Sequence, residues 1–245
     1  MKFAKISSFL LSVVLISCTT QQINQTIGIL GNTAGGSTAK ALTSGDVTAG
    51  LREALITGIN LSSGKASKQD GYLKNSLIKI PFPSELDKVK NTMNDLGMNK
   101  LVTDFETSIN RGAEKAAIKA APIFINAIKS MSIQDAWGLL KGGDNAATNF
   151  LKKSTSSQLF TAFKPIIHQS LGQVNATKHF STIVNRYNQI PLVSDVNPDL
   201  DEYATNKAID GLFKLVALEE AKIRENPAAR TSSVLQKVFN QANWK

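Results

Sequence analysis

Three polar residues that could take part in chemistry lie four positions apart in the middle of the chain. Glu106, Asn110 and Glu114 fall on one stripe of a predicted helix, beside its apolar face, because residues four apart lie one above the other. Asp104 and Arg111 are expected on the opposite flank. Two carboxylates lining a cleft are suited to acid–base chemistry or to ligand binding. Together with Arg111 from that flank, these three residues make up the candidate functional polar row: Glu106, Asn110, Arg111 and Glu114.

The same row has a structural interpretation. Its side chains could bond to the backbone of a loop, or pair with Arg111, Lys115 or Arg230. Polar networks of this kind fix the packing of helical bundles, and neither a nucleophile nor a set of metal ligands accompanies the row. The sequence favours the structural interpretation and leaves the functional one open.

Two other groups of residues resemble metal sites but have the wrong spacing. A calcium loop is suggested by residues two apart: Asp195, Asn197, Asp199 and Asp201. The positions that would need Gly and Glu hold Leu200 and Asn206, so capping of the next helix by Asp199 or Asp201 is the better explanation. His168 and His179 are eleven apart on different predicted helices and form no zinc motif. The sequence predicts neither a metal nor a cofactor.

The N-terminal segment has the pattern of a secretory signal. Lys2 and Lys5 precede an apolar run at 9–16 that is too short to span a bilayer. The residues LIS at 15–17, followed by Cys18, look like a bacterial lipobox. That resemblance implies cleavage before Cys18 and lipid on its thiol and amino group. An ordinary signal followed by a chance cysteine is the alternative.

The residues after the lipobox bear on location. Cys18 is followed by TTQQ at 19–22, with no Asp directly after the cysteine and no acidic run. By resemblance to lipoproteins of enteric-type bacteria, this predicts the cell envelope, on the periplasmic face of the outer membrane. The membrane is then a partner through the lipid on Cys18, since three acyl chains exceed what stable anchoring requires.

The charge balance bears on other partners. The formal net charge is +9, from 28 Lys and Arg against 19 Asp and Glu. Such an excess favours an anionic lipid or an acidic envelope protein as partner, although it also serves solubility alone. The basic residues are scattered rather than gathered in a stripe, so nucleic acid is not an expected partner.

The elements that position these residues are predicted to be helices. Apolar residues recur at helical spacing from Asp46 onward, and pairs such as Ser132 with Asp135 are typical of helix starts. Asp144 can cap the helix that follows, and Gly97 is typical of a helix end. The predicted buried face of the helix at about 100–120 consists of Leu101, Val102, Phe105, Ile109, Gly112, Ala113 and Ala116. Neither a repeat nor strand–helix alternation is present. We expect an all-α protein, an irregular bundle of about nine helices, with a kink or break at Pro165. At most one very short extended segment is expected, near 77–82, where apolar and other residues alternate.

The domain organisation follows from composition. Residues 1–17 are the predicted lipoprotein signal peptide, and 18–45, rich in Thr, Asn, Gly and Ser, are a predicted flexible tether that carries lipidated Cys18. Residues 46–245 are predicted to form a single helical domain. Within it, the small residues of 112–117 would let a neighbouring helix approach closely, with the helix at 160–167 as the candidate neighbour.

Several long stretches resemble a bacterial envelope family known as domain of unknown function 4197. They are IPFPSELDKV, LGMNKLVTDFETSINRGAEKAA, APIFINAIKSMSIQDAWGLLKGGDNAATNFLKKSTS, PLVSDVNPDLDEYATNKAIDGLF and NPAARTSSVLQKVF. Together they cover most of residues 45–240. The resemblance implies a secreted, all-helical protein, often with a lipoprotein signal, and it implies no assigned activity and no catalytic residues.

Three functions remain to be compared. The first is a non-enzymatic lipoprotein that acts as a binding or scaffold module of the cell envelope. The second is a carrier that holds an apolar ligand or lipid between helices, beside the small residues of 112–117. The third is an acid–base enzyme that uses Glu106 and Glu114. The sequence favours the first.

Overall fold

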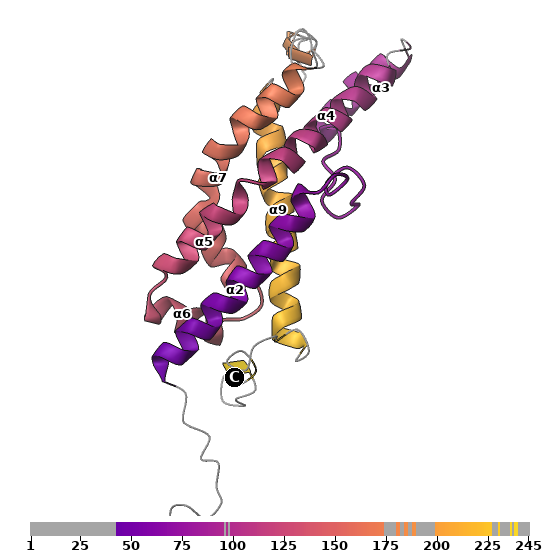
Figure 1. Ribbon diagram of the computed structural model, residues 1–245. Helices are drawn as coiled ribbons and strands as arrows, with labels where there is room; N and C mark the ends of the chain where they lie inside the picture. The colour runs from indigo at the N-terminus through magenta and orange to yellow at the C-terminus, as the bar shows by residue number, and fades with distance from the viewer. Residues whose placement is uncertain are drawn as a thin grey trace, which may run out of the picture. The chain divides into compact units, whose positions relative to one another are not determined.

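The computed structural model describes residues 43–95, 97, 99–173, 180–181, 184–185, 188–189, 199–226, 230, 236 and 238–239. These described residues belong to one compact unit. The described residues contain seven α-helices, one 3-10 turn and no β-strand, which confirms the all-α class (Figure 1). The elements are α2 (Ser44–Ser67), η1 (Ser84–Leu86), α3 (Asp87–Asp95), α4 (Asn99–Ala117), α5 (Ala120–Ser130), α6 (Ile133–Lys141), α7 (Ala146–Gly172) and α9 (Leu200–Glu225).

The expectation of about nine helices was too high for the described residues. Two of the expected helices, at 180–187 and 231–239, are described only in part. A further difference is α7, which runs without a break from Ala146 to Gly172 although it contains Pro165. Of the predicted kink or break at Pro165, the break is therefore absent.

The position of Pro165 on α7 explains why the helix continues. Proline removes one backbone bond, to the carbonyl four residues earlier, which belongs to Thr161. Thr161 and Pro165 are both exposed, so water can bond to that carbonyl. Phe163 and Ile167 on the opposite side are fully buried and hold both halves of the helix against the core.

Helix starts follow the capping residues. Ser132 caps α6, and its side chain and that of Asp135 form the predicted reciprocal pair of hydrogen bonds. The first helix begins at Ser44, before the expected Asp46, because Thr43 is the N-cap and Asp46 is its capping-box partner. Asp46 thus helps to cap the helix from inside its first turn.

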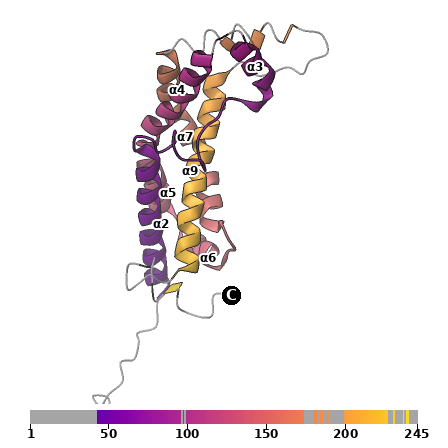
Figure 2. The ribbon, with the colours of Figure 1, turned by 90° about the vertical axis from the view of Figure 1, so that its right-hand side faces the viewer.

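The long helices pack side by side around a shared apolar core. Helix α4 packs against α7, α7 against α9, and α9 against α2, while α5 and α6 contact both α2 and α7 (Figures 1 and 2). The predicted inner face of α4 is buried at all positions except Leu101, which is half-buried: Val102, Phe105, Ile109, Gly112, Ala113 and Ala116. None of the described helices has an apolar stretch long enough to cross a bilayer.

Small residues bring α4 close to α7, as expected from their spacing. A Cβ atom on Gly112 would lie 3.1 Å from the Cβ of Ser170 and 3.3 Å from the Cα of Ile167. Ala113, Ala116 and the neighbouring α7 side chain of Ile167 are fully buried. The contact between these helices is therefore tightly packed.

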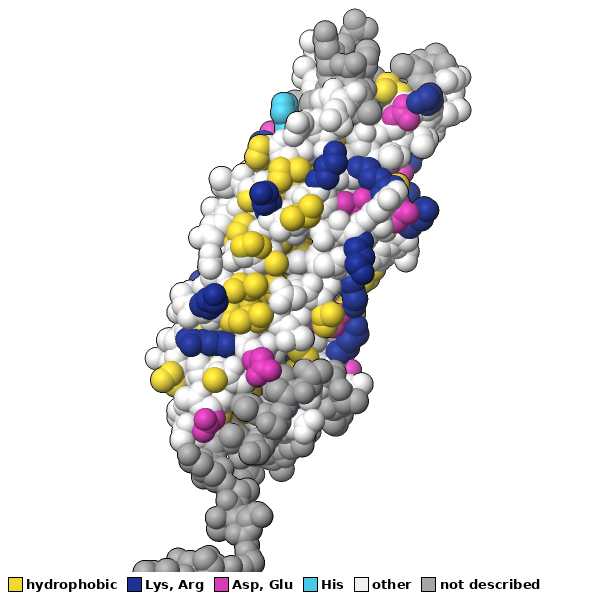
Figure 3. Space-filling view, viewed as in Figure 1, with side chains coloured by type: hydrophobic (Ala, Val, Ile, Leu, Met, Phe, Trp, Pro, Cys, Tyr) yellow, Lys and Arg dark blue, Asp and Glu magenta, His cyan; other side chains and the backbone are white. Residues whose placement is uncertain are grey.

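The outer surface of α5 is partly apolar. Ile123 and Ile125 are half-buried, and Ile118, just before the helix, is 62% exposed. Figure 3 shows the corresponding face of the molecule, where hydrophobic side chains gather in the middle and Lys and Arg side chains lie around them.

The segment between α2 and η1 contains no strand, which agrees with the expectation of at most one very short extended segment near 77–82. The predicted alternation is present, because Ile78, Ile80 and Phe82 are buried while Lys79 and Pro81 are exposed. The segment runs across α9 (Figure 2). Its hydrogen-bond partners lie on α4 and on α9.

Candidate functional site

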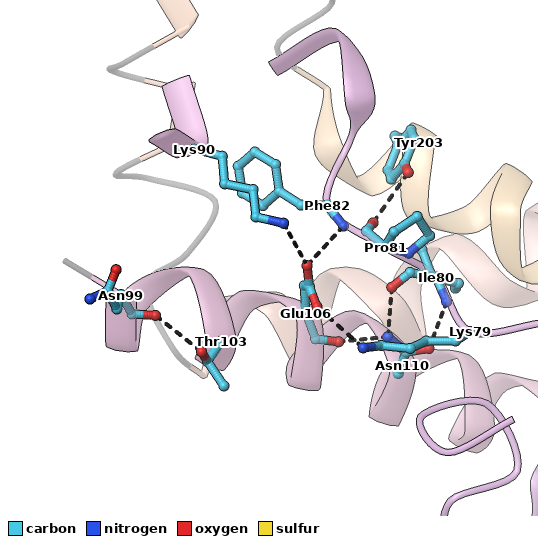
Figure 4. Close-up of polar contacts among 10 residues, drawn as sticks. All are labelled: Lys79, Ile80, Pro81, Phe82, Lys90, Asn99, Thr103, Glu106, Asn110 and Tyr203. Carbon is cyan, nitrogen blue, oxygen red and sulfur yellow. Dashed lines mark hydrogen bonds and ion pairs between the residues drawn. The ribbon is translucent and has the colours of Figure 1, made fainter. Parts of the chain in front are cut away.

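All four residues of the candidate polar row lie on α4 and contact the segment 70–82. Asn110 occupies the centre of the row and is fully buried. Its Oδ1 accepts a hydrogen bond from the Ile80 N–H at 2.9 Å, and its Nδ2 donates to the Ile80 carbonyl at 2.8 Å (Figure 4). The same Nδ2 also donates to the Glu106 carbonyl at 2.7 Å. The carboxamide thus pairs with Ile80 as a neighbouring β-strand would, which satisfies both backbone groups of a buried residue.

Glu106 lies one turn before Asn110 and holds the end of the segment. Its Oε1 accepts the Phe82 N–H at 3.3 Å and is 3.5 Å from Nζ of Lys90 (Figure 4). Its Oε2 is 3.4 Å from Nζ of Lys79. One carboxylate therefore contacts one backbone N–H and two ammonium groups.

Glu114 lies one turn after Asn110 and holds the beginning of the segment. Its Oε1 accepts the N–H groups of Tyr72 at 3.1 Å and Leu73 at 3.2 Å. Its Oε2 accepts a 2.7 Å bond from Nη1 of Arg111. The Glu114 side chain is buried, and each of its oxygens has a partner. A buried carboxylate is tolerated when it is paired and hydrogen-bonded in this way.

Arg111 was expected on the opposite flank of the helix. It instead joins Glu114 to the segment 70–82. Its Nη2 donates to Oδ1 of Asp70 at 2.7 Å, and Asp70 also pairs with Lys74. Hydrogen bonds from Lys74 and Arg111 lower the pKa of Asp70, and hydrogen bonds to Glu114 and Asp70 raise the pKa of Arg111. The pairing follows from helix geometry, because residues three apart are neighbours on a helix surface.

Two other residues considered with the row, Asp104 on the opposite flank and the expected partner Arg230, bind elsewhere. Asp104 pairs with Lys100 at 2.5 Å on the exposed side of α4. Arg230 is buried and donates to the carbonyls of Ile223 and Arg224, at the end of α9. The polar row therefore bonds to the segment 70–82 and does not contact Arg230.

Helix α9 holds the other side of the segment. The buried hydroxyl of Tyr72 donates to the Ala208 carbonyl at 2.7 Å, and burial raises the pKa of Tyr72. Tyr203 donates to the Pro81 carbonyl at 3.2 Å. At Gly211 a Cβ atom would lie 3.0 Å from the Tyr72 ring and 3.1 Å from the Cβ of Ile78, so a glycine permits the close approach. The segment is clamped between α4 and α9.

This region lies inside a stretch that matches a known family model. The model is described as "Protein of unknown function (DUF4197)", and it matches residues 41–240 of the chain. The chain belongs to the DUF4197 family. A search of curated proteins and a search of solved structures each gave no match.

The DUF4197 region contains a second polar cluster that sequence analysis missed. Glu220 on α9 accepts the backbone N–H groups of Ala147 at 3.0 Å and Thr148 at 2.8 Å, together with the Thr148 hydroxyl at 2.8 Å. It therefore caps α7 from another helix. Asp144 had been expected to cap this helix. The N-cap is instead Asn145, whose side chain makes no capping bond.

Arg224 completes this cluster. It donates from Nε to Glu220 at 2.9 Å and from Nη2 to the Leu139 carbonyl at 2.9 Å, at the C-terminal end of α6. A carboxylate thus faces a helix N-terminus and a guanidinium faces a helix C-terminus, as the helix dipoles favour. The four-residue spacing of Glu220 and Arg224 predicts only that they pair on one helix. Nothing in the neighbouring sequence predicts their distant partners on α6 and α7.

The remaining candidates lie apart from the polar row. Asp199 caps α9 by accepting the Glu202 N–H at 2.9 Å, and it also binds Lys164. His168 is 2.5 Å from Asp201. Within the described residues no group of three or more potential ligands could hold a metal ion. Four residues named as candidates lie outside the described residues: Cys18, His179, Asp195 and Asn197.

Proposed function

We propose that this DUF4197 protein is a lipid-anchored protein of the cell envelope that works as a non-enzymatic binding or scaffold module. The proposal rests on one observation: the side chains of the polar row bond to the protein's own backbone. Glu106, Asn110 and Glu114 each bond to backbone groups of the segment 70–82. Side chains with this role hold a surface in shape, and another molecule binds to that surface.

The bonding of Glu114 argues against acid–base chemistry by the row. A general acid or base must reach a substrate proton within hydrogen-bond distance. Both oxygens of Glu114 already have partners, and the side chain is buried. Releasing either oxygen would leave buried backbone N–H groups or the Arg111 guanidinium unpaired, which is costly.

The tight contact between α4 and α7 argues against the carrier alternative. A lipid carrier needs an apolar cavity of several hundred Å³. At Gly112 the neighbouring helix already lies at contact distance, since a methyl group added to this glycine would come within 3.1 Å of Ser170. A cavity lined by Gly58 and Leu151, between α2, α7 and α9, has about 20 Å³, which is room for about one water molecule.

The signal pattern and the charge support the envelope part of the proposal. The run at 9–16 followed by Cys18 is typical of a lipoprotein precursor. We propose that lipid on Cys18 anchors the protein to the periplasmic face of the outer membrane. The positive net charge of the chain favours an anionic lipid or an acidic envelope protein as its partner.

Palmitate labelling tests the anchor. Cells grown with radiolabelled palmitate are expected to label the wild-type protein, and a Cys18→Ser variant is expected to remain unlabelled and to leave the membrane fraction. Equal membrane association of the two proteins, without label in either, would refute lipid anchoring. A Thr19→Ser variant serves as the control and should label as the wild type does.

Glutamine substitution tests the non-enzymatic part. Glu106→Gln and Glu114→Gln keep an acceptor for the backbone but lose the charge that binds the basic side chains. If the row is structural, any loss of complementation of a deletion strain should parallel a loss of unfolding free energy. A variant that is as stable as the wild type yet fails to complement would make the row a functional site.

A further inference from the structure

The clamped segment forms one wall of a groove that the polar row does not enter. The groove has a volume of about 680 Å³ and is lined by residues 76–81 together with side chains of α7 and α9. This is within the size range of small-molecule sites, which is roughly 300–1,000 Å³. The groove therefore has room for a ligand larger than a single ion.

The floor of the groove consists of two helical stripes. Helix α9 contributes Lys207, Asp210, Gly211 and Lys214, and α7 with its N-cap residue contributes Asn145, Thr148, Asn149 and Lys152. Both sets have the spacing of one helix face, since their members lie three, four and seven residues from the first. Because α7 and α9 pack together, the two stripes meet along one line. Residues of both helices would thus contact the same ligand.

The wall is held at a defined distance from this floor. Asn110 bonds both backbone groups of Ile80, and Gly211 lets Ile78 approach α9 closely. Ile78 and Ile80 are buried at the base of the wall, whereas Lys79 is exposed. The polar row of α4 therefore shapes the groove from behind.

The groove carries an excess of positive charge. Among the described residues that line it, the basic ones are Lys79, Lys152, Lys207 and Lys214, and the acidic one is Asp210. Lys152 and Asp210 form a bridge of 3.4 Å across the floor, with both side chains about half exposed. Lys214 is exposed and has no ion-pair partner within the described part of the chain. Because Nζ of Lys79 also lies 3.4 Å from Glu106, the excess comes from Lys152, Lys207 and Lys214 against Asp210, which leaves a charge of about +2 in the concave surface.

The groove also offers neutral donors and apolar contacts. The side chains of Asn145 and Asn149 are exposed at the start of α7 and can donate hydrogen bonds. Leu77 is 45% exposed at the rim, and Nζ of Lys152 lies 6.0 Å from the ring centre of Phe213. A ligand with an anionic group and a less polar part would find partners for both.

We propose that this groove binds a ligand that bears phosphate groups. Phosphate carries between one and two negative charges and several strong acceptor oxygens, which match several ammonium groups and amide donors. Concave positive surfaces raise the local concentration of such anions. The phosphate comes either from the headgroup of an anionic phospholipid or from a soluble phosphate compound. This inference names the ligand class of the proposed binding module and rests on that proposed function.

Binding is tested on the full chain carrying Cys18→Ser, so that no attached lipid contributes. One arm titrates inorganic pyrophosphate in a calorimeter at low salt. The other arm sediments the protein with phosphatidylcholine vesicles that contain or lack phosphatidylglycerol. Binding of pyrophosphate alone would indicate a soluble ligand, and binding to the anionic vesicles alone would indicate a lipid headgroup. Either result supports a phosphate site in the groove only if the lysine variants alter it.

The variants test whether the groove is the site. Lys214→Gln is expected to weaken binding about five-fold, because one exposed charge pair contributes up to about five-fold in affinity. The double variant Lys207→Gln with Lys214→Gln loses two such pairs, so its binding should weaken roughly twenty-fold. Asp210→Asn removes the one acidic side chain described in the groove and should strengthen binding by a few-fold on the same scale. These substitutions lie at exposed positions, so the melting temperature without ligand should change little.

Lys153→Gln is the matched control, because this exposed lysine of α7 follows Lys152 but does not line the groove. Its binding should equal that of the parent chain. The inference is overturned if neither probe binds, or if Lys153→Gln weakens binding as much as Lys214→Gln does, since that would mean binding by net charge alone. Failure of palmitate labelling would refute the anchor without affecting this test, because the titrated chain lacks Cys18.

Discussion

The Asn110 carboxamide of α4 pairs with both the N–H and the carbonyl of Ile80, at 2.9 and 2.8 Å. Ile80 belongs to a segment with no strand beside it, and the residue is buried. One side chain thus satisfies two backbone groups that water cannot reach. The pairing also holds the wall of the basic groove, so it links the polar row to the proposed ligand site.

Replacing Asn110 should destabilise the protein strongly. Asn110→Ala leaves two buried backbone groups of Ile80 without partners, and we expect a loss of about 3 kcal/mol in the free energy of unfolding. Asn110→Asp keeps the shape but cannot donate to the Ile80 carbonyl, so it should destabilise as well. Urea unfolding followed by circular dichroism measures both losses.

Asn126 provides the control for this prediction. It lies exposed on α5, so Asn126→Ala should change the free energy of unfolding by less than about 0.5 kcal/mol. If Asn110→Ala were as stable as Asn126→Ala, the pairing with Ile80 would contribute little and the segment would be held by other contacts.

Glu220 should be the most sensitive acidic residue of α9. It caps α7 and pairs with Arg224, so Glu220→Ala leaves the N–H groups of Ala147 and Thr148 and a mostly buried guanidinium unpaired. We expect a loss of about 3 kcal/mol in unfolding free energy, and a smaller loss of about 1 kcal/mol for Glu220→Gln. Exposed Glu225 is the control, and similar losses for Glu225→Ala would contradict the capping role.

The same glycine-to-alanine substitution should have opposite effects at two helical positions. In Gly112→Ala the new methyl group meets buried atoms of α7 at 3.1 and 3.3 Å, including backbone, and overpacking should outweigh the gain in helix propensity by about 1 kcal/mol. In Gly138→Ala the methyl group meets nothing within 4 Å on an exposed face of α6, and the variant should be about 1 kcal/mol more stable.

Thermal unfolding of the two glycine variants gives this comparison directly. The melting temperature should fall for Gly112→Ala and rise for Gly138→Ala. A rise for both would mean that α4 and α7 can move apart easily. The carrier alternative would then deserve a search for bound lipid.

Glu219 should contribute to loss of stability in acid. Burial alone would raise the pKa of Glu219, but hydrogen bonds from Lys65 and Lys222 outweigh it and hold this pKa below the ordinary value of 4.5. The native state therefore binds fewer protons than the unfolded state near this pH. The contribution of Glu219 is fully present above the ordinary pKa and is lost as the pH falls through the lower, folded-state value.

The pH dependence of Glu219→Gln checks this assignment. Unfolding free energies measured between about pH 6 and pH 3 should fall less steeply for the variant than for the wild type, because glutamine does not titrate. Glu225→Gln removes a carboxylate from the exposed end of the same helix and serves as the comparison variant. Identical slopes for wild type and Glu219→Gln would show that other carboxylates dominate the acid response.

Local sequence was enough to predict the helical class and several boundaries. Ser132 and Asp135 form the expected capping box, and Gly97 has the positive φ of 77° expected after a helix. The inner face of α4 was also predicted correctly. These features depend on residues three or four apart, and such residues interact within one helix wherever that helix lies.

Predictions failed where distant parts of the chain decide the outcome. Pro165 suggested a break, but burial of Phe163 and Ile167 keeps α7 continuous. Asp144 looked like a cap for α7, but Glu220 of α9 binds the first N–H groups. In both cases the competing local signal was real, and packing against another helix outweighed it.

The spacing of Glu106, Asn110 and Glu114 determined that these side chains share one stripe of a helix, since four residues make about one turn. What they bond to was decided by the tertiary structure, which brings the backbone of 70–82 across that stripe. The groove between this segment, α7 and α9 likewise exists only after packing. The residues that form these hydrogen bonds and charge clusters lie 30 to 136 positions apart in the sequence. Contacts at such separations produce no periodic pattern in the sequence, so only the folded chain shows them.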